Sequence, residues 1–310
     1  MRLRDLGERG LISRIERAAA KVSGRSVVLG IGDDAALLRP RAGEDVVVST
    51  DASVENVHFR FSNESPRNVG RRALVANLSD LAAMGARPMG FVLALGAPGE
   101  LLVKRVDGLV AGLLHEAVRH GCPLIGGNCS QAGEVSLAIT ALGAVKRGNA
   151  LTRRGVRAGD RLLVTGVLGA AALDRARAER RGRVRHVAEP RLRAGLALTR
   201  VRGVGSCIDI SDGLEADLGQ VLDAAGLAAD LEPAGLPLPR GFRRACAALG
   251  LEPLALALGG GEDYELLFTL RPRGPSAAWL SQRLGVAVTE IGRVVVGRRQ
   301  EQRGWRHFAR

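Results

Sequence analysis

Apolar residues follow two spacings along the chain, and turn residues separate the segments. Alternating or short β-branched runs predict strands, and apolar residues three or four positions apart predict helices. In the first half, strands are expected at 26–32, 45–51, 89–96 and 135–145, and helices at 66–85 and 100–121. In the second half, strands are expected at 161–166, 207–211, 264–270 and 289–296, with a helix at 213–226. This alternation of strands and helices is typical of an α/β or α+β protein.

A polar, glycine-containing connection at 146–160, "KRGNALTRRGVRAGD", separates the two halves. The chain of 310 residues is long enough for two domains with a hydrophobic core. We therefore expect one domain at 1–149 and another at 150–310. No internal repeat is evident.

Composition favours an ordinary globular protein of the cytoplasm. Hydrophobic residues make up 46% of the chain, but no apolar run approaches the roughly 18 residues that a membrane helix needs. The first 21 residues form a charged amphipathic pattern instead of a signal peptide. The cysteines, Cys122, Cys129, Cys207 and Cys246, show no Cys-x-x-Cys spacing, so neither a zinc site nor a disulfide framework is predicted. No membrane partner is expected.

The formal net charge of +13 comes almost entirely from arginine, because only three of the 45 basic residues are lysines. This skew suggests genome-wide codon bias as a hypothesis, although a basic surface attracts polyanions whatever its origin. The densest cluster, at 175–193, has no interleaved aromatic residue and no recognisable nucleic-acid motif. We interpret it as a solvated helical face or a mobile loop, and we expect no nucleic-acid partner.

Carboxylates recur where predicted strands end. The stretch 207–218, "CIDISDGLEADL", contains four, Asp33, Asp34 and Asp51 follow other predicted strands, and Asp80 lies on the helix predicted at 66–85. Each alone is explained by helix capping or turn chemistry. Asp33 beside Asp34, and Asp209 near Asp212, supply more carboxylates than helix caps require. Two unit charges about 4 Å apart repel by roughly 4 kcal/mol at an effective dielectric near 20. Converging carboxylates would therefore need cations.

Carboxylates beside Ser and Thr, with no His or Cys cluster, favour Mg²⁺, which usually retains waters and binds substrate phosphates. None of the three lysines fits a Walker motif, and no protein-kinase signature set or Gly-x-Gly-x-x-Gly strand-to-helix turn is present. These observations indicate phosphoryl transfer that depends on metal more than on lysine.

Nine segments resemble, in order, the signature blocks of the thiamine-monophosphate kinase family and cover nearly the whole chain. They are "GIGDDAALL", "STDASVENVHF", "RRALVANLSDLAAMGARP", "LIGGN", "ALTRRG", "GDRLLVTGVLG", "IDISDGLEADL", "GGGEDYELLFT" and "GWRHF". The resemblance implies the two-domain fold of aminoimidazole-ribonucleotide synthetase, with N-terminal domains that pair into a dimeric β-barrel and a C-terminal mixed α/β domain. It also implies a homodimer that uses ATP, several Mg²⁺ ions and thiamine monophosphate.

The resemblance also implies roles for individual residues. Those implied to hold magnesium are Asp34, Ser49, Thr50, Asp51, Asp80, Asp209 and Asp212, and those implied to contact ATP are Gly127, Asn128, Arg153 and Ser211. Those implied to contact the thiamine part of the substrate are His58, Glu262 and Trp305. A structural histidine and a tryptophan at a core edge are the alternative interpretations of His58 and Trp305. Glu215 and Asp217 are expected on an exposed helix face, without function.

A phosphate acceptor already offers an ionised oxygen near neutral pH, because its second pKa is about 6. We therefore predict in-line transfer of the γ-phosphoryl group without a general base, through positioning and charge neutralisation.

One departure from the family pattern concerns "GGNCS", where the family has Gly-Gly-Asp-Thr. Asn128 replaces a carboxylate that would bind magnesium, so we expect weaker magnesium binding at one site with activity retained. Two alternatives stay open: another ATP-using enzyme of the same superfamily, and a non-catalytic nucleotide-binding relative weakened at Asn128.

Overall fold

The computed structural model describes residues 1–20 and 22–297, which divide into two compact units. Unit 1 contains residues 1–81, 87–147 and 182–187, and unit 2 contains residues 82–86, 148–181 and the described residues from 188 onward. Each unit is therefore built from discontinuous stretches of the chain. Within the described residues, no helix combines the length and apolar character needed to cross a membrane.

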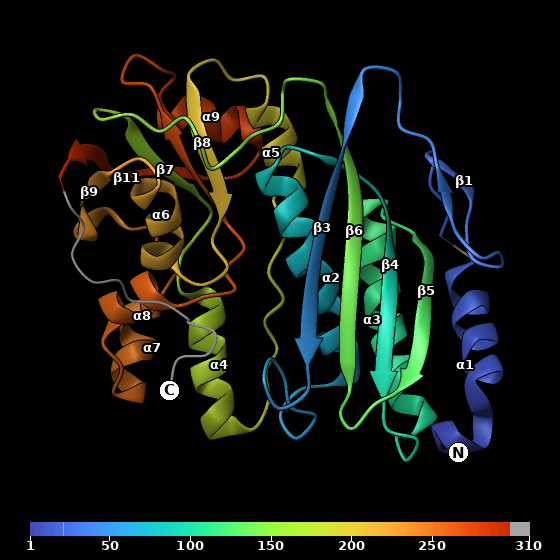
Figure 1. Cartoon of the computed structure of the whole chain (residues 1–310). Helices are drawn as coiled ribbons and strands as arrows, with labels where there is room; N and C mark the ends of the chain where they lie inside the picture. The colour runs from blue at the N-terminus through green and yellow to red at the C-terminus, as the bar shows by residue number, and fades with distance from the viewer. Residues whose placement is uncertain (21, 298–310) are drawn as a thin grey trace. The chain divides into compact units, whose positions relative to one another are not determined.

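Unit 1 is centred on a four-stranded sheet with the strand order β3-β6-β4-β5 (Figure 1). The strands are β3 (Glu44–Val54), β6 (Ser136–Lys146), β4 (Arg87–Ala97) and β5 (Leu124–Gln131). β6 pairs antiparallel with β3 and β4, whereas β4 and β5 are parallel. β3 and β5 are consequently the two edges of this sheet.

Two helices, α2 (Pro66–Ala83) and α3 (Val103–His120), lie behind the sheet of unit 1 in Figure 1. Strand alternation gives the sheet one buried face, with Leu137 and Ile139 on β6, and one open face, with Val46 and Val48 on β3. The helices approach very closely, since a Cβ at Gly70 would lie 2.0 Å from the backbone oxygen of Leu109. Only glycine fits there.

The N-terminal helix α1 (Leu3–Ala19) packs against α3 and β5. Its buried residues are Leu3, Leu11, Ile15 and Ala19, which is the one-sided pattern of an amphipathic helix. The short strands β1 (Val27–Leu29) and β2 (Leu37–Leu38) form a separate two-stranded sheet after it.

Unit 2 contains a five-stranded antiparallel sheet with the order β8-β10-β7-β11-β9. The strands are β7 (Arg161–Thr165), β8 (Val204–Asp209), β9 (Leu227–Leu231), β10 (Leu266–Leu270) and β11 (Val288–Val296). The helices are α4 (Ala170–Arg181), α5 (Leu192–Leu198), α6 (Leu214–Asp223), α7 (Phe242–Leu249), α8 (Pro253–Gly259) and α9 (Ala277–Leu284), with a 3₁₀ turn at Pro233–Gly235. Residues of α6 spaced by four, Leu214, Leu218 and Leu222, pack with Ile208 and Leu267 of the sheet in one core cluster.

The elements predicted from residue spacing are present, with ends that shift by a few residues. Three strands were missed, β2, β5 and β9. β5 carries two adjacent glycines and three polar residues, and such composition is depleted in strands. Pairing with β4, which is non-local, makes this segment a strand.

Candidate active site

Three predicted metal ligands are consecutive residues of β3, and strand alternation sends them to opposite faces of the sheet. The Ser49 hydroxyl donates a hydrogen bond to Asp80 Oδ2 on α2. The Thr50 hydroxyl lies on the other face and donates to the backbone oxygen of Ile139 at 3.1 Å. Asp51 is two residues from Ser49 and therefore shares its face. The structure places Ser49, Asp51 and Asp80 on one side of the sheet and uses the Thr50 hydroxyl within the sheet.

Asp34 and His58 lie in turns near these strands. Asp34 is exposed in the turn between β1 and β2, where its N–H donates to Asp33 Oδ1 at 2.8 Å. His58 Nδ1 accepts a hydrogen bond from the N–H of Val54, the last residue of β3, at 3.1 Å. The neutral ring therefore carries its proton on Nε2. This bond orients the ring, which also supports the structural interpretation of His58.

Gly127 and Asn128 lie on β5, at the opposite edge of the sheet from β3. A Cβ at Gly127 would lie 2.0 Å from the backbone oxygen of Leu93, so this position requires glycine. Asn128 is exposed and pairs with Ala94 of β4, which puts it on the open face. Within one chain, β6 and β4 separate Asn128 from Asp51, and the two residues are not brought together.

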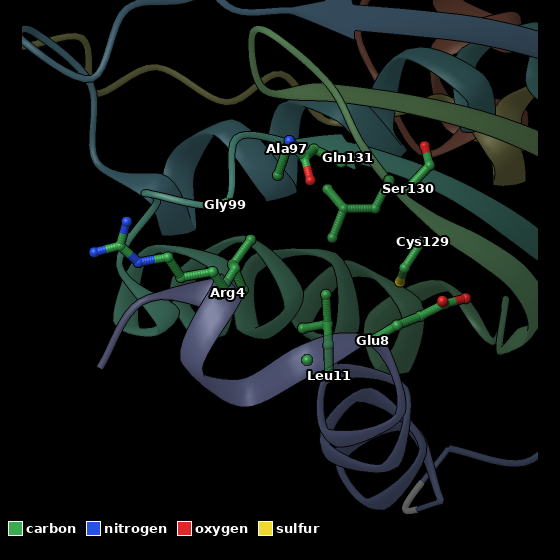
Figure 2. A pocket seen from close by; sticks show the side chains of 11 residues that line it. Arg4, Glu8, Leu11, Ala97, Gly99, Cys129, Ser130 and Gln131 are labelled. Carbon is green, nitrogen blue, oxygen red and sulfur yellow. The ribbon is translucent and has the colours of Figure 1, made fainter.

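A pocket of about 270 Å³ lies between α1 and β5, with Cys129 on its wall (Figure 2). The Cys129 side chain points from β5 toward α1, beside Glu8. Burial and the Glu8 charge raise the pKa of the Cys129 thiol above its ordinary 9.0. A smaller pocket of about 70 Å³ shares Cys129 and is lined by Gly127 and Asn128. The sequence contains no signal for these pockets, because α1 and β5 are far apart along the chain.

In unit 2, β8 ends at Asp209, which is buried, and leads into the turn that carries Ser211 and Asp212. Asp217 holds this turn: its Oδ2 accepts the N–H groups of Ser211, Asp212 and Gly213 at 2.9, 3.0 and 3.2 Å. Burial raises the pKa of Asp217 to about 7, although these hydrogen bonds lower it. The expectation of an exposed Asp217 is wrong, because its side chain folds inward onto the turn.

Glu262 lies beside the same turn, since its N–H donates to the backbone oxygen of Ser211 at 2.8 Å. Its carboxylate is paired with Arg175 of α4. Glu262 and Tyr264 both adopt positive φ, at 68° and 51°, a conformation that non-glycine residues rarely adopt outside functional sites and tight turns. The structure thus brings the predicted substrate residue Glu262 next to the predicted ATP residue Ser211.

Two buried carboxylates next to Glu262 fix its loop. Asp263 accepts the N–H groups of Gly169 and Ala171 at 2.5 and 3.1 Å. Burial raises the pKa of Asp263 to about 7, although these hydrogen bonds lower it. The charge of Glu265 adds to the rise. Glu265 itself forms a bidentate ion pair with Arg191 at 2.5 and 2.6 Å.

The arginine-rich segment 175–193 is therefore not only a solvated surface, because Arg175 and Arg191 hold carboxylates of the Glu262 loop. Arg153, predicted to contact ATP, is exposed and donates to Gln220 Oε1 at 2.5 Å. Trp305, predicted to contact the substrate, lies outside the described residues.

The oxygen donors of Ser49 and Asp80 are of the hard kind that magnesium prefers. Among residues 1–20 and 22–297, no group of three or more His, Cys, Asp or Glu side chains is placed to hold a metal by itself. Mg²⁺ is commonly bound by one or two carboxylates together with waters and substrate phosphates, so a complete protein cage is not required. The pairing of Ser49 with Asp80 supplies such a partial set of hard donors.

The chain is similar to known proteins over most of its length. The family model "AIR synthase related protein, N-terminal domain" matches residues 32–145. A thiamine-monophosphate kinase of Mycobacterium tuberculosis is 38% identical over 274 residues, covering 86% of this chain and 81% of the relative. The chain belongs to the thiamine-monophosphate kinase family.

Solved structures of thiamine-monophosphate kinases share the fold. The crystal structure from Stenotrophomonas maltophilia has a TM-score of 0.79 and 36% identity, covering 93% of this chain and 94% of that one. A structure described as AaThiL complexed with AMPPCP and TMP has a TM-score of 0.73 and 28% identity, covering 99% of both chains. The predicted family resemblance, the kinase class and a mixed α/β fold are confirmed. The individual roles of the site residues stay predictions.

Proposed function

We propose that the chain transfers the γ-phosphoryl group of ATP to thiamine monophosphate and forms thiamine diphosphate. The observation that carries the proposal is the hydrogen bond between Glu262 and Ser211, which joins the predicted substrate and nucleotide loops. The thiamine-monophosphate kinase bound to AMPPCP and TMP supports the same pair of ligands. In this proposal residues 1–149 supply metal and nucleotide contacts, and residues 150–310 complete the site.

The chemistry requires positioning more than proton transfer. The acceptor phosphate has a second pKa of about 6, so near neutral pH it offers an ionised oxygen and needs no general base. Asp51, Asp80 and Ser49 would hold magnesium on unit 1, and Asp209 and Asp212 would do so on unit 2. Bound Mg²⁺ would neutralise charge on the two polyanions. Arg153 and the Ser211 turn would hold ATP, while Glu262 and His58 would orient the thiamine part.

A homodimer completes the proposal, with the open face of the unit 1 sheet as its interface. Val46 and Val48 on β3 are 47% and 61% exposed, and β3 is an edge strand. An apolar edge of this kind favours pairing with a second copy, which would form the dimeric β-barrel. Asn128 lies on the same face, so its contribution to a metal site would depend on the dimer.

The proposal is tested with the purified full chain, ATP, Mg²⁺ and thiamine monophosphate, following thiamine diphosphate by chromatography. We expect product with wild type and none with Asp51→Asn. ATP binding without product would favour the non-catalytic alternative, and product from another phosphate acceptor would favour a different enzyme of the superfamily. Light scattering tests the dimer: Val48→Arg should give a monomer with lower activity, and a dimeric Val48→Arg would contradict the interface.

A further inference from the structure

Asp217 organises the turn that carries Ser211 and Asp212. A single carboxylate oxygen accepts three successive backbone N–H groups, and the side chain is entirely buried. Carboxylates that accept several amide hydrogen bonds hold the backbone in one conformation, because each bond is strengthened by the charge. The direction of the Ser211 and Asp212 side chains therefore depends on Asp217.

Gln220 lies one turn further along α6 and links Asp217 to Arg153. Its Nε2 donates to Asp217 Oδ1 at 3.2 Å, and its Oε1 accepts from Arg153 Nη1 at 2.5 Å. A glutamine suits this place because its amide offers donors and an acceptor at once. Glutamate would offer no donor to Asp217, and alanine would offer neither group.

Helix capping alone explains only part of this arrangement. Gly213 is the N-cap residue of α6, so its hydrogen bond to Asp217 satisfies one backbone donor at the start of the helix. The bond from Arg153 to Gln220 caps nothing, since it joins the helix to the connection before β7. Arg153 has five N–H donors, so donation to Gln220 leaves others for a ligand.

We propose that Asp217 and Gln220 are positioning residues of the nucleotide site: Asp217 sets the Ser211–Gly213 turn, and Gln220 aligns the Arg153 guanidinium with that turn. The ligand that both would orient is the phosphate chain of a nucleoside triphosphate. The inference rests on the proposed function, because Arg153 and Ser211 are the residues expected to bind ATP.

The test compares Gln220→Ala and Arg153→Ala, alone and combined, by ATP titration calorimetry and by steady-state kinetics. Loss of a hydrogen bond to a charged group costs about tenfold in affinity. We expect Gln220→Ala to raise Kd and KM for ATP by about that factor, with KM for thiamine monophosphate unchanged within about twofold. In the Arg153→Ala background, Gln220→Ala should cause no further rise in Kd or KM for ATP.

Gln282→Ala is the matched control, because Gln282 is an exposed glutamine on α9 of the same unit. Unchanged ATP affinity in Gln220→Ala overturns the role of Gln220, and additive effects in the double variant overturn the link to Arg153. Asp217→Asn should weaken ATP binding and lower kcat together, and wild-type values would overturn its role. If the Asp217→Asn variant fails to fold, the Gln220 variants still test the proposal. ATP binding needs no acceptor, so absence of turnover in wild type would count against the proposed function alone.

Discussion

The backbone N–H of Glu262 donates to the carbonyl oxygen of Ser211 at 2.8 Å, although 51 positions separate the two residues. The N–H of Tyr264 continues the pairing with the carbonyl of Ile210 at 2.9 Å. Two backbone hydrogen bonds therefore join the loop after β8 to the loop before β10. Because β8 and β10 are neighbours in the sheet, their ends place the predicted substrate residue Glu262 beside the predicted nucleotide residue Ser211.

Glu262→Gln should raise KM for thiamine monophosphate by about tenfold, because a hydrogen bond to a charged group is weakened. KM for ATP should stay within about twofold, since Ser211 keeps its backbone bond to residue 262. Steady-state kinetics with each substrate varied in turn measures both. Glu290→Gln, which removes another half-buried carboxylate of unit 2 that is paired with an arginine, is the control. Equal changes in the two KM values would contradict a substrate role for Glu262.

Asn128→Asp should lower the Mg²⁺ concentration needed for half-maximal rate by about threefold to tenfold, because a carboxylate attracts the ion more strongly than an amide. Asn128→Ala should raise the Mg²⁺ concentration needed for half-maximal rate. Initial rates over a Mg²⁺ titration at saturating ATP measure the effect. Identical Mg²⁺ titration curves for wild type and both variants would contradict the idea that residue 128 ligates magnesium.

Asp263 should make stability fall as pH rises from about 4 to 7. Its pKa is raised in the folded state from an ordinary 3.8 to about 7. Between these values the folded chain holds a proton that the unfolded chain has released, so the contribution is complete below pH 4 and lost above pH 7. Urea unfolding of wild type and Asp263→Asn measures this, and the variant should gain relative stability across the interval. If the free energy of unfolding changed with pH in the same way in wild type and in Asp263→Asn, the raised pKa of Asp263 would be contradicted.

Cys129 should react slowly with iodoacetamide at pH 8, because the thiolate is the reactive form and the pKa is raised by burial and by Glu8. Glu8→Gln should speed the reaction. Mass spectrometry of the folded protein follows the label, and urea-unfolded protein gives the unperturbed rate. A rate in Glu8→Gln equal to that of wild type would show that Glu8 does not influence the thiol.

Gly70→Ala should destabilise unit 1, since its Cβ would lie 2.0 Å from the Leu109 oxygen and the two helices would have to separate. We expect a loss of about 2 kcal/mol, as for other overpacked sites. Gly10→Ala in α1 is the control, because its Cβ would meet only the flexible side chain of Leu6. An exposed helical glycine replaced by alanine usually gains up to about 1 kcal/mol. Thermal unfolding that showed a gain at both positions would contradict the close packing.

The sequence by itself determined the strands and helices with strong periodicity, such as 45–51 and 66–85, because side-chain alternation is a local property. It also determined the family, since nine short blocks in a fixed order carry more information than any single motif. The separation of Asn128 from Asp51 could not be predicted, because it depends on the order of strands in the sheet.

Tertiary structure alone decided the environment of Asp217 and Glu262. Local patterning placed Asp217 on an exposed helix face, but three backbone N–H groups of a preceding turn draw its carboxylate inward. Similarly, nothing near Glu262 in the sequence indicates Ser211 or Arg175 as neighbours. Periodicity reports which face of an element is apolar, whereas hydrogen bonds between distant segments form only when the sheet has assembled.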